Sequence, residues 1–398
     1  MKQKIIYFLK NTLLINIAIF IILAPFSKKA VKISLLIALV LWILITIAEF
    51  GSNFYRHLIV KTPINKQLMF FAFALLLSTV FSVDPYYSHA VLLERYLGYI
   101  LFFFLGSYLV KSKRNLSVLI GAVILAGFVM GVGGMWDYFH LKPVRLYTAF
   151  GKTISNARFM VLQIPLCFII LLYSKNKFLK SGAIISILFL IPCLILNAAR
   201  AAWVAVTSVL LIVSFFKNRK CAAYLLICVI IIGLFLPQQL KHRAVTTVNP
   251  MTWGERLPLW KMSLDIFADF PVFGAGLGMQ ERLFVRYWKQ LPFPLHFQFH
   301  DVHNNYLQIM SESGIIGLIA FVWIFIAFFK HVFTILKEIS GHRQVILMGL
   351  TGSVIAALIF AMSASNITAG VQEAAVFWFI FGMASGLIAL KENQENIA

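Results

Sequence analysis

Long, nearly uncharged apolar runs constrain this chain more than any other feature of its sequence. They recur from one end to the other, and most approach the length of about 20 residues that an α-helix needs to cross a bilayer. Only 12% of the residues are charged, whereas a soluble domain is about one quarter charged. The sequence therefore predicts an all-α membrane protein with about twelve transmembrane helices, at 11–26, 32–50, 67–82, 89–110, 115–136, 157–173, 181–198, 201–216, 221–236, 304–329, 345–363 and 371–390.

The distribution of Lys and Arg predicts which side of the membrane each loop faces. With both termini in the cytoplasm, every cytoplasmic segment carries Lys or Arg, while the short outer loops 82–88 and 363–370 carry neither, as the positive-inside rule requires. The hairpin with Lys28, Lys29 and Lys32 disagrees. Either this hairpin is tolerated outside, or the first two runs are not both spans. The first run lacks a small-residue cleavage site and is interpreted as a retained anchor.

The formal net charge of +21 does not indicate nucleic-acid binding. The Lys and Arg residues form short clusters between apolar runs, where topology and anionic lipid headgroups account for them. We therefore expect membrane lipids, and no nucleic acid, as partners of these charges; nothing in the sequence indicates an oligomeric state. The cysteines show no metal-ligand spacing and are interpreted as small apolar side chains: Cys167, Cys193, Cys221 and Cys228.

The predicted organisation is nine transmembrane helices over 1–236, one large periplasmic loop over 237–302, and three further helices over 303–398. Within the loop, residues 254–270 predict an amphipathic helix lying along the outer leaflet. Its apolar stripe has helical spacing and consists of Leu257, Trp260, Leu264 and Phe267. The glycine run at 274–278 follows no strand and precedes no Lys-Ser/Thr pair, so it predicts a sharp turn in preference to a phosphate cradle.

The stretch 291–317 carries the densest group of titratable and amide side chains. His303 lies where the loop becomes helix, and the positive end of a helix dipole keeps an imidazole neutral. A neutral imidazole can act as a general base, although a histidine that merely caps the helix fits the position equally well. Glu312 lies nine residues later on the opposite helix face, so a direct pair with His303 is not expected.

A metal site is the alternative interpretation of this stretch, because imidazole and carboxylate groups are common Zn²⁺ ligands. Prolines at 292 and 294 argue against the helix that would bring His296 and His300 together. We therefore expect no metal and no cofactor. The potential ligands are His296, His300, Asp301 and His303.

Arginines at span ends are the second group of candidates. Arg200 interrupts two apolar runs, and its planar guanidinium suits a phosphate group; snorkelling to the headgroups is the alternative. Arg256 starts the amphipathic helix beside Glu255, where it could serve a diphosphate or pair with that glutamate. Arg158 opens a span, while Arg95 follows Glu94 and is interpreted as part of an ion pair within the bundle.

Three motifs, taken in this order, resemble the bacterial O-antigen ligase and polymerase superfamily of membrane glycosyltransferases. They are N-A-A-R-A-A-W with Arg200, R-x-x-x-W…P-x-x-G-x-G-L-G from Arg256 to Gly278, and H-N-x-x-L-x-x-x-x-E-x-G from His303 to Gly314. The resemblance extends to the twelve predicted spans and to the large loop between the ninth and the tenth.

The resemblance implies a metal-independent, inverting glycosyltransferase of the bacterial inner membrane with a periplasmic active site. Its donor would be an undecaprenyl-diphosphate-linked glycan and its acceptor a sugar hydroxyl of lipid A–core. His303 would be the general base, and Arg200 and Arg256 would hold the diphosphate. A polymerase of the same superfamily and a non-catalytic transporter of lipid-linked glycan are the alternatives. Further substrate-binding candidates are Arg158, His300, Asn304 and Glu312.

Overall fold

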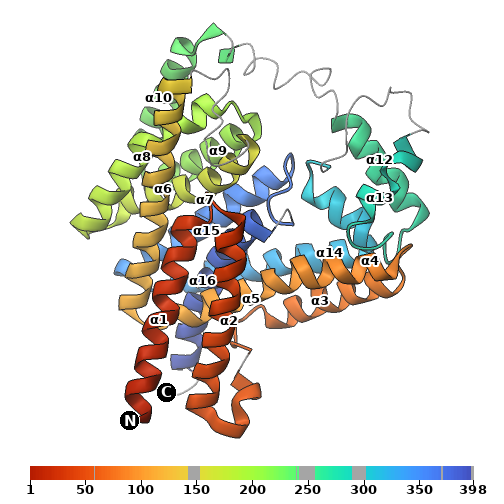
Figure 1. Ribbon diagram of the computed structural model, residues 1–398. Helices are drawn as coiled ribbons and strands as arrows, with labels where there is room; N and C mark the ends of the chain where they lie inside the picture. Colours follow the sequence, from red (N-terminus) through yellow and green to blue (C-terminus); the bar gives the residue numbers. More distant parts are fainter. Residues whose placement is uncertain are drawn as a thin grey trace.

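The computed structural model describes residues 1–57, 59–141, 153–238, 240–241, 256–288, 302–368 and 371–395. All regular structure within these residues is helical (Figure 1). The α-helices are α1 (Lys2–Leu23), α2 (Lys28–Phe50), α3 (Asn65–Val80), α4 (Pro85–Val91), α5 (Leu97–Leu109), α6 (Lys113–Leu141), α7 (Thr153–Tyr173), α8 (Lys177–Asn197), α9 (Arg200–Lys217), α10 (Arg219–Phe235), α12 (Arg256–Asp269), α13 (Met279–Trp288), α14 (Asn305–Ile335), α15 (Gly341–Ala361) and α16 (Val371–Glu395). Two further segments are the 3₁₀-helix η1 (Gly51–His57) and the π-helix η2 (Leu92–Tyr96).

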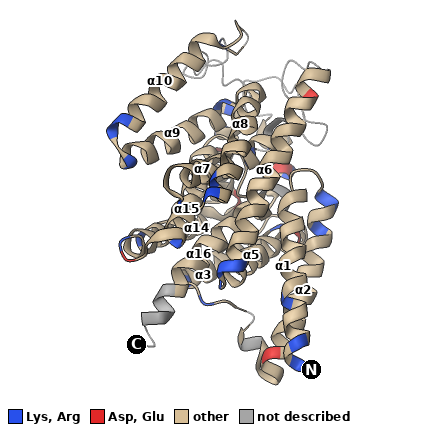
Figure 2. Cartoon of the chain, turned by 90° about the vertical axis from the view of Figure 1, so that its left-hand side faces the viewer, with Lys and Arg blue, Asp and Glu red and all other residues tan. Residues whose placement is uncertain are grey.

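Every predicted apolar run forms a helix, so the all-α class is confirmed for the described residues. Among them, nine helical segments are long and apolar enough to cross a membrane, and these include both α1 and α2. The apolar helix α3 and the 374–390 part of α16 are shorter, and α10 has 17 residues. The chain is thus a multi-pass membrane protein, and the number of twelve spans stays a prediction. Lys and Arg lie mainly near helix ends and turns (Figure 2).

Close approach of backbones holds the centre of the bundle together. In α16, a side chain at Gly382 would overlap the Phe103 carbonyl of α5, and one at Gly106 would overlap the Phe379 carbonyl. The Ser107 hydroxyl donates to the Gly382 carbonyl across the same contact (2.9 Å). Small residues at helix contacts are typical of membrane bundles, where dispersion forces and interhelical hydrogen bonds replace the hydrophobic effect.

The pair α7 and α15 packs in the same way and runs antiparallel. The Ser353 hydroxyl of α15 donates to the Leu162 carbonyl of α7 (2.5 Å), and Gly349, one turn earlier, faces Leu166. Gly352 also faces Val209 of α9, at 3.5 Å from the position of a Cβ. α15 therefore packs against both α7 and α9.

In the described residues of the predicted 237–302 loop, α12 and α13 are the helices with defined bounds, and they lie beside one end of α14 (Figure 1). Their shared core is separate from that of the bundle and includes Leu259, Met262, Ile266, Leu283 and Trp288. The sequence predicted α12 but missed α13. The predicted stripe is divided: Trp260 packs against this core, whereas Leu257 and Leu264 are 42% and 46% exposed. The contact of the exposed part with lipid stays a prediction.

A buried hydroxyl joins the C-terminal ends of α12 and α13. Tyr287 donates to the Asp269 carboxylate (2.5 Å). Burial, together with this bond and the negative charge of Asp269, raises the pKa of Tyr287 to about 12. The phenol therefore stays protonated at neutral pH and continues to donate.

Candidate active site

A break in α14 organises the site. Gly314 has φ 65° and ψ −168°, which interrupts the helix that otherwise runs from Asn305 to Ile335. Such backbone angles are nearly restricted to glycine. The break leaves backbone groups on either side without their helical partners, and another segment of the chain must supply new ones.

The glycine-rich turn at 271–278 supplies those partners. The Ala275 amide donates to the Ser311 carbonyl (2.9 Å), the Gly276 amide donates to the Glu312 carbonyl (3.0 Å), and the Ile315 amide donates to the Pro271 carbonyl (2.9 Å). The predicted sharp turn is confirmed. It docks its backbone on α14.

The same turn also contacts the segment between α3 and α4. The Val83 amide donates to the Ala275 carbonyl (3.0 Å), and the Ser88 hydroxyl donates to the Leu277 carbonyl (3.0 Å). A side chain at Gly276 would overlap Ser82. The motif glycines therefore serve close backbone packing between three segments that are distant in the sequence.

His303 lies at the entrance to α14, as predicted, and is half-buried. Its φ is 54°, a left-handed conformation that few non-glycine residues adopt and that clusters at functional sites. The Asn304 side-chain oxygen caps the helix by accepting from the Tyr306 and Leu307 amides (3.0 and 3.1 Å). The indole of Trp260 in α12 donates to the Val302 carbonyl (3.2 Å), which anchors the residue just before His303.

The loop between α15 and α16 is bound to the start of α14. The Asn305 side-chain oxygen accepts from the Asn366 and Ile367 amides (2.9 and 3.1 Å), while its amide donates to the Thr368 hydroxyl. That hydroxyl in turn donates to Gln308 (2.8 Å). These buried bonds make the loop part of the site. In the sequence, the only signal from this loop was its lack of Lys and Arg.

Arg256 contacts the other end of this loop. It is the first residue of α12 and lies one helical turn before Trp260, so both side chains share one helix face. Its guanidinium donates to the Ser363 hydroxyl. Through Trp260 and Ser363, the structure brings Arg256 to the segment that carries His303.

Arg200 and Arg158 lie at the corresponding ends of α9 and α7. Arg200 is the first residue of α9, and the indole of Trp203 fixes that first turn by donating to the Leu194 carbonyl of α8 (2.7 Å). Val209, nine residues after Arg200 in α9, faces Gly352 of α15. Arg158 lies one turn before Leu162 in α7 and is buried, at 9% exposure.

Glu312 has a cationic neighbour that the sequence did not predict. It is buried in α14, with 3% exposure, where it accepts from Gln308 (3.4 Å) and from the Gly278 backbone amide. The guanidinium of Arg95, in the π-helical segment η2, interacts electrostatically with this carboxylate. π-Helical turns occur frequently at functional sites.

Glu94, the sequence neighbour of Arg95, forms an ion pair with Lys32 (3.0 Å), which also accounts for one cation of the anomalous first hairpin. The charge of Arg95 acts on Glu94 and also on the buried Glu312. Because its charge acts on Glu312, Arg95 is added to the candidate residues of the site.

Several predicted candidates lie outside the described residues, namely His296, His300 and Asp301. Among the residues that are described, no three His, Cys, Asp or Glu side chains form a potential metal site. The expected absence of a metal stays a prediction. All four cysteines are free thiols, in agreement with their interpretation as apolar side chains.

Comparison with known proteins agrees with the motifs. Residues 185–322, about a third of the chain, match the family described as O-antigen ligase. The match extends from α8 into α14 and covers Arg200, Arg256, His303 and Glu312. It confirms the resemblance to the O-antigen ligase superfamily over this part of the chain. No curated protein matches the chain.

Proposed function

We propose that this membrane protein is an inverting glycosyltransferase that moves an O-antigen glycan from undecaprenyl diphosphate to a sugar hydroxyl of lipid A–core. The reaction would take place at the periplasmic face of the inner membrane. The observation that best supports it is the linkage of Arg256 to the segment carrying His303, through Trp260 and the loop that starts at Ser363. A cation for the leaving group and a base for the nucleophile are both required near one anomeric carbon.

In this mechanism, His303 accepts the proton of the acceptor hydroxyl. The acceptor oxygen then forms a bond to the anomeric carbon while the bond from that carbon to the diphosphate oxygen breaks. One displacement from the opposite face inverts the anomeric centre. Undecaprenyl diphosphate leaves, and Arg200 and Arg256 stabilise its developing negative charge; positioned cations of this kind are often the largest contribution to catalysis.

The remaining candidates have supporting roles in this proposal. Arg158 and Asn304 are further substrate-binding candidates, and Glu312, which accepts from the Gly278 amide and interacts with Arg95, would support the docked turn. A polymerase of the same superfamily would use the same residues, because it breaks the same bond. A transporter could also bind diphosphate through arginines, but it has no use for a base.

A complementation experiment tests the proposal. The gene, or its His303→Asn variant, is expressed in a ligase-deficient host, and lipopolysaccharide is resolved on a gel. Long-chain ladders are expected with the parent chain and not with the variant. The exposed histidine His89 supplies the control, since His89→Asn should leave the ladders intact.

Two results would overturn different parts of this proposal. Ladders that persist with His303→Asn would exclude His303 as the base. Failure of the parent chain here, with rescue of a polymerase-deficient host from single-repeat capping to a ladder, would identify the polymerase instead.

A further inference from the structure

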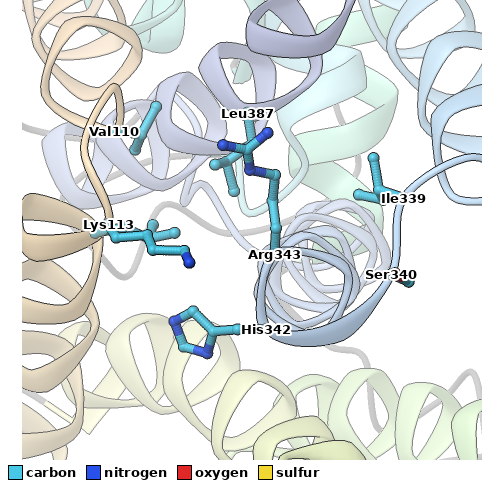
Figure 3. Close-up of a pocket in the computed structure, with 8 residues that line it drawn as sticks. Val110, Lys113, Ile339, Ser340, His342, Arg343 and Leu387 are labelled. Atoms are coloured by element: carbon cyan, nitrogen blue, oxygen red, sulfur yellow. The ribbon is translucent and has the colours of Figure 1, made fainter.

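A cavity of about 350 Å³ lies at the end of the bundle opposite to His303. It is formed where α6 starts, where α14 passes into α15, and beside the last turns of α16 (Figure 3). None of its lining residues belongs to the site described above. The positive-inside pattern assigns this end to the cytoplasm.

Three basic side chains converge on this cavity, and no acidic residue lines it. Lys113 and His342 point toward one another, while Arg343 extends toward Leu387 (Figure 3). The charge of Lys113 acts on the His342 ring. Within the described part of the chain, neither Lys113 nor Arg343 makes an ion pair, and the buried Nε2 atom of His342 has no hydrogen-bond partner.

The helix ends increase the positive potential. Lys113 is the first residue of α6, and His342 and Arg343 lie in the first turn of α15. Neither first turn contains an acidic residue. Cations at helix N-termini oppose the helix dipole. The like charges therefore repel one another across the cavity, and a bound anion would lower their electrostatic energy.

We propose that this cavity binds a phosphate group, with Lys113 and Arg343 as charged donors and the His342 side chain as part of its wall. The rest of the wall is apolar and includes Val110, Leu116 and Leu387. A phosphate carried by an anionic lipid of the cytoplasmic leaflet would satisfy both halves of this lining. A soluble phosphate ester would satisfy the charged half alone.

The test uses the purified full-length protein in neutral detergent. Phosphatidylglycerol is titrated in, and bound lipid is counted by native mass spectrometry. The double variant Lys113→Gln/Arg343→Gln should raise the dissociation constant roughly ten-fold or more, since each lost contact is a charge-assisted hydrogen bond. The matched control is Arg219→Gln/Lys220→Gln, which removes the same charge from the first turn of α10 and should change binding less than about two-fold.

Competition separates the two sources of phosphate. Displacement of the lipid by glycerol 3-phosphate or inorganic phosphate at similar concentration identifies a soluble ligand, and its absence identifies the lipid. Each outcome supports the cavity as a phosphate site.

Equal effects of the pocket and control variants, or none in the pocket variant, would overturn the proposal. Misfolding is checked by thermal unfolding without phosphate, where removal of repelling charges should leave the double variant at least as stable as the parent.

Discussion

The substitution Gly314→Ala tests whether the docking of the glycine-rich turn stabilises the protein. Alanine would have to adopt φ 65° and ψ −168°, a region essentially restricted to glycine that costs about 1–3 kcal/mol. Its Cβ would also overlap the Val272 carbonyl and lie 2.7 Å from the Gly274 nitrogen. Overpacking of this kind adds about 1–3 kcal/mol. We expect the free energy of unfolding to fall by about 2–6 kcal/mol from these two costs.

Two other glycines separate the contributions. Gly51 has a comparable φ of 57° with nothing within 4 Å of a built Cβ, so Gly51→Ala carries the strain alone. Gly233 in α10 has neither strain nor a close neighbour, and Gly233→Ala should cause no loss. The three variants are compared by denaturant unfolding in detergent micelles. If Gly314→Ala and Gly51→Ala lose the same stability, the turn contributes nothing by docking and the reasoning is refuted.

Three further predictions concern the site. His303→Asn should change the free energy of unfolding by less than about 0.5 kcal/mol, because Asn tolerates positive φ. Glycan transfer should fall by roughly 10²–10⁴-fold in a gel assay normalised to folded protein. Arg95→Gln leaves the buried Glu312 carboxylate without its cation, so the double variant Arg95→Gln/Glu312→Gln should be more stable than Arg95→Gln, with a coupling of about 0.5–3 kcal/mol in a double-mutant cycle. Asn305→Ala leaves the Asn366 and Ile367 amides without an acceptor and should lower the free energy of unfolding by about 2–6 kcal/mol, measured as above.

The helices and the starts of the key helices were predictable from the sequence. Apolar runs of membrane-spanning length leave the backbone no alternative to helix, because unsatisfied amides are too costly in lipid. Arg200, Arg256 and His303 were each placed at a helix start, and the structure puts them within or next to the first turn of α9, α12 and α14. These predictions depend only on local sequence.

Contacts between distant segments were not predictable. Arg95 was interpreted as part of an ion pair within the bundle, but the sequence did not indicate that Glu312 would be the buried carboxylate on which it acts, or that Glu94 would pair with Lys32. Which carboxylate an arginine reaches depends on helix packing, and no periodicity encodes it. The signal that could have indicated a role was an arginine inside an apolar run, which is costly without a function. Likewise, α13 was missed because its charged residues hid an apolar face that packs on α12.

The motif residues divide into two classes that should respond differently to substitution. Gly274 and Gly314 allow backbones to meet at distances that no side chain permits, and Gly276 leaves room for the Ser82 and Ser88 side chains, so loss of these glycines should reduce the amount of folded protein. His303 and Arg256 lie at or next to the start of a helix, where their side chains carry the proposed chemical groups, so their loss should reduce activity per folded molecule. The glycine variants should therefore show a low folded yield, and the His303 and Arg256 variants a low activity at normal yield.

Glu312 belongs to both classes, because its backbone carbonyl accepts a hydrogen bond from the turn while its carboxylate interacts with Arg95. The variant Glu312→Gln keeps the first interaction and removes the charge needed for the second. Full yield with reduced transfer in that variant would assign the carboxylate a role beyond the scaffold.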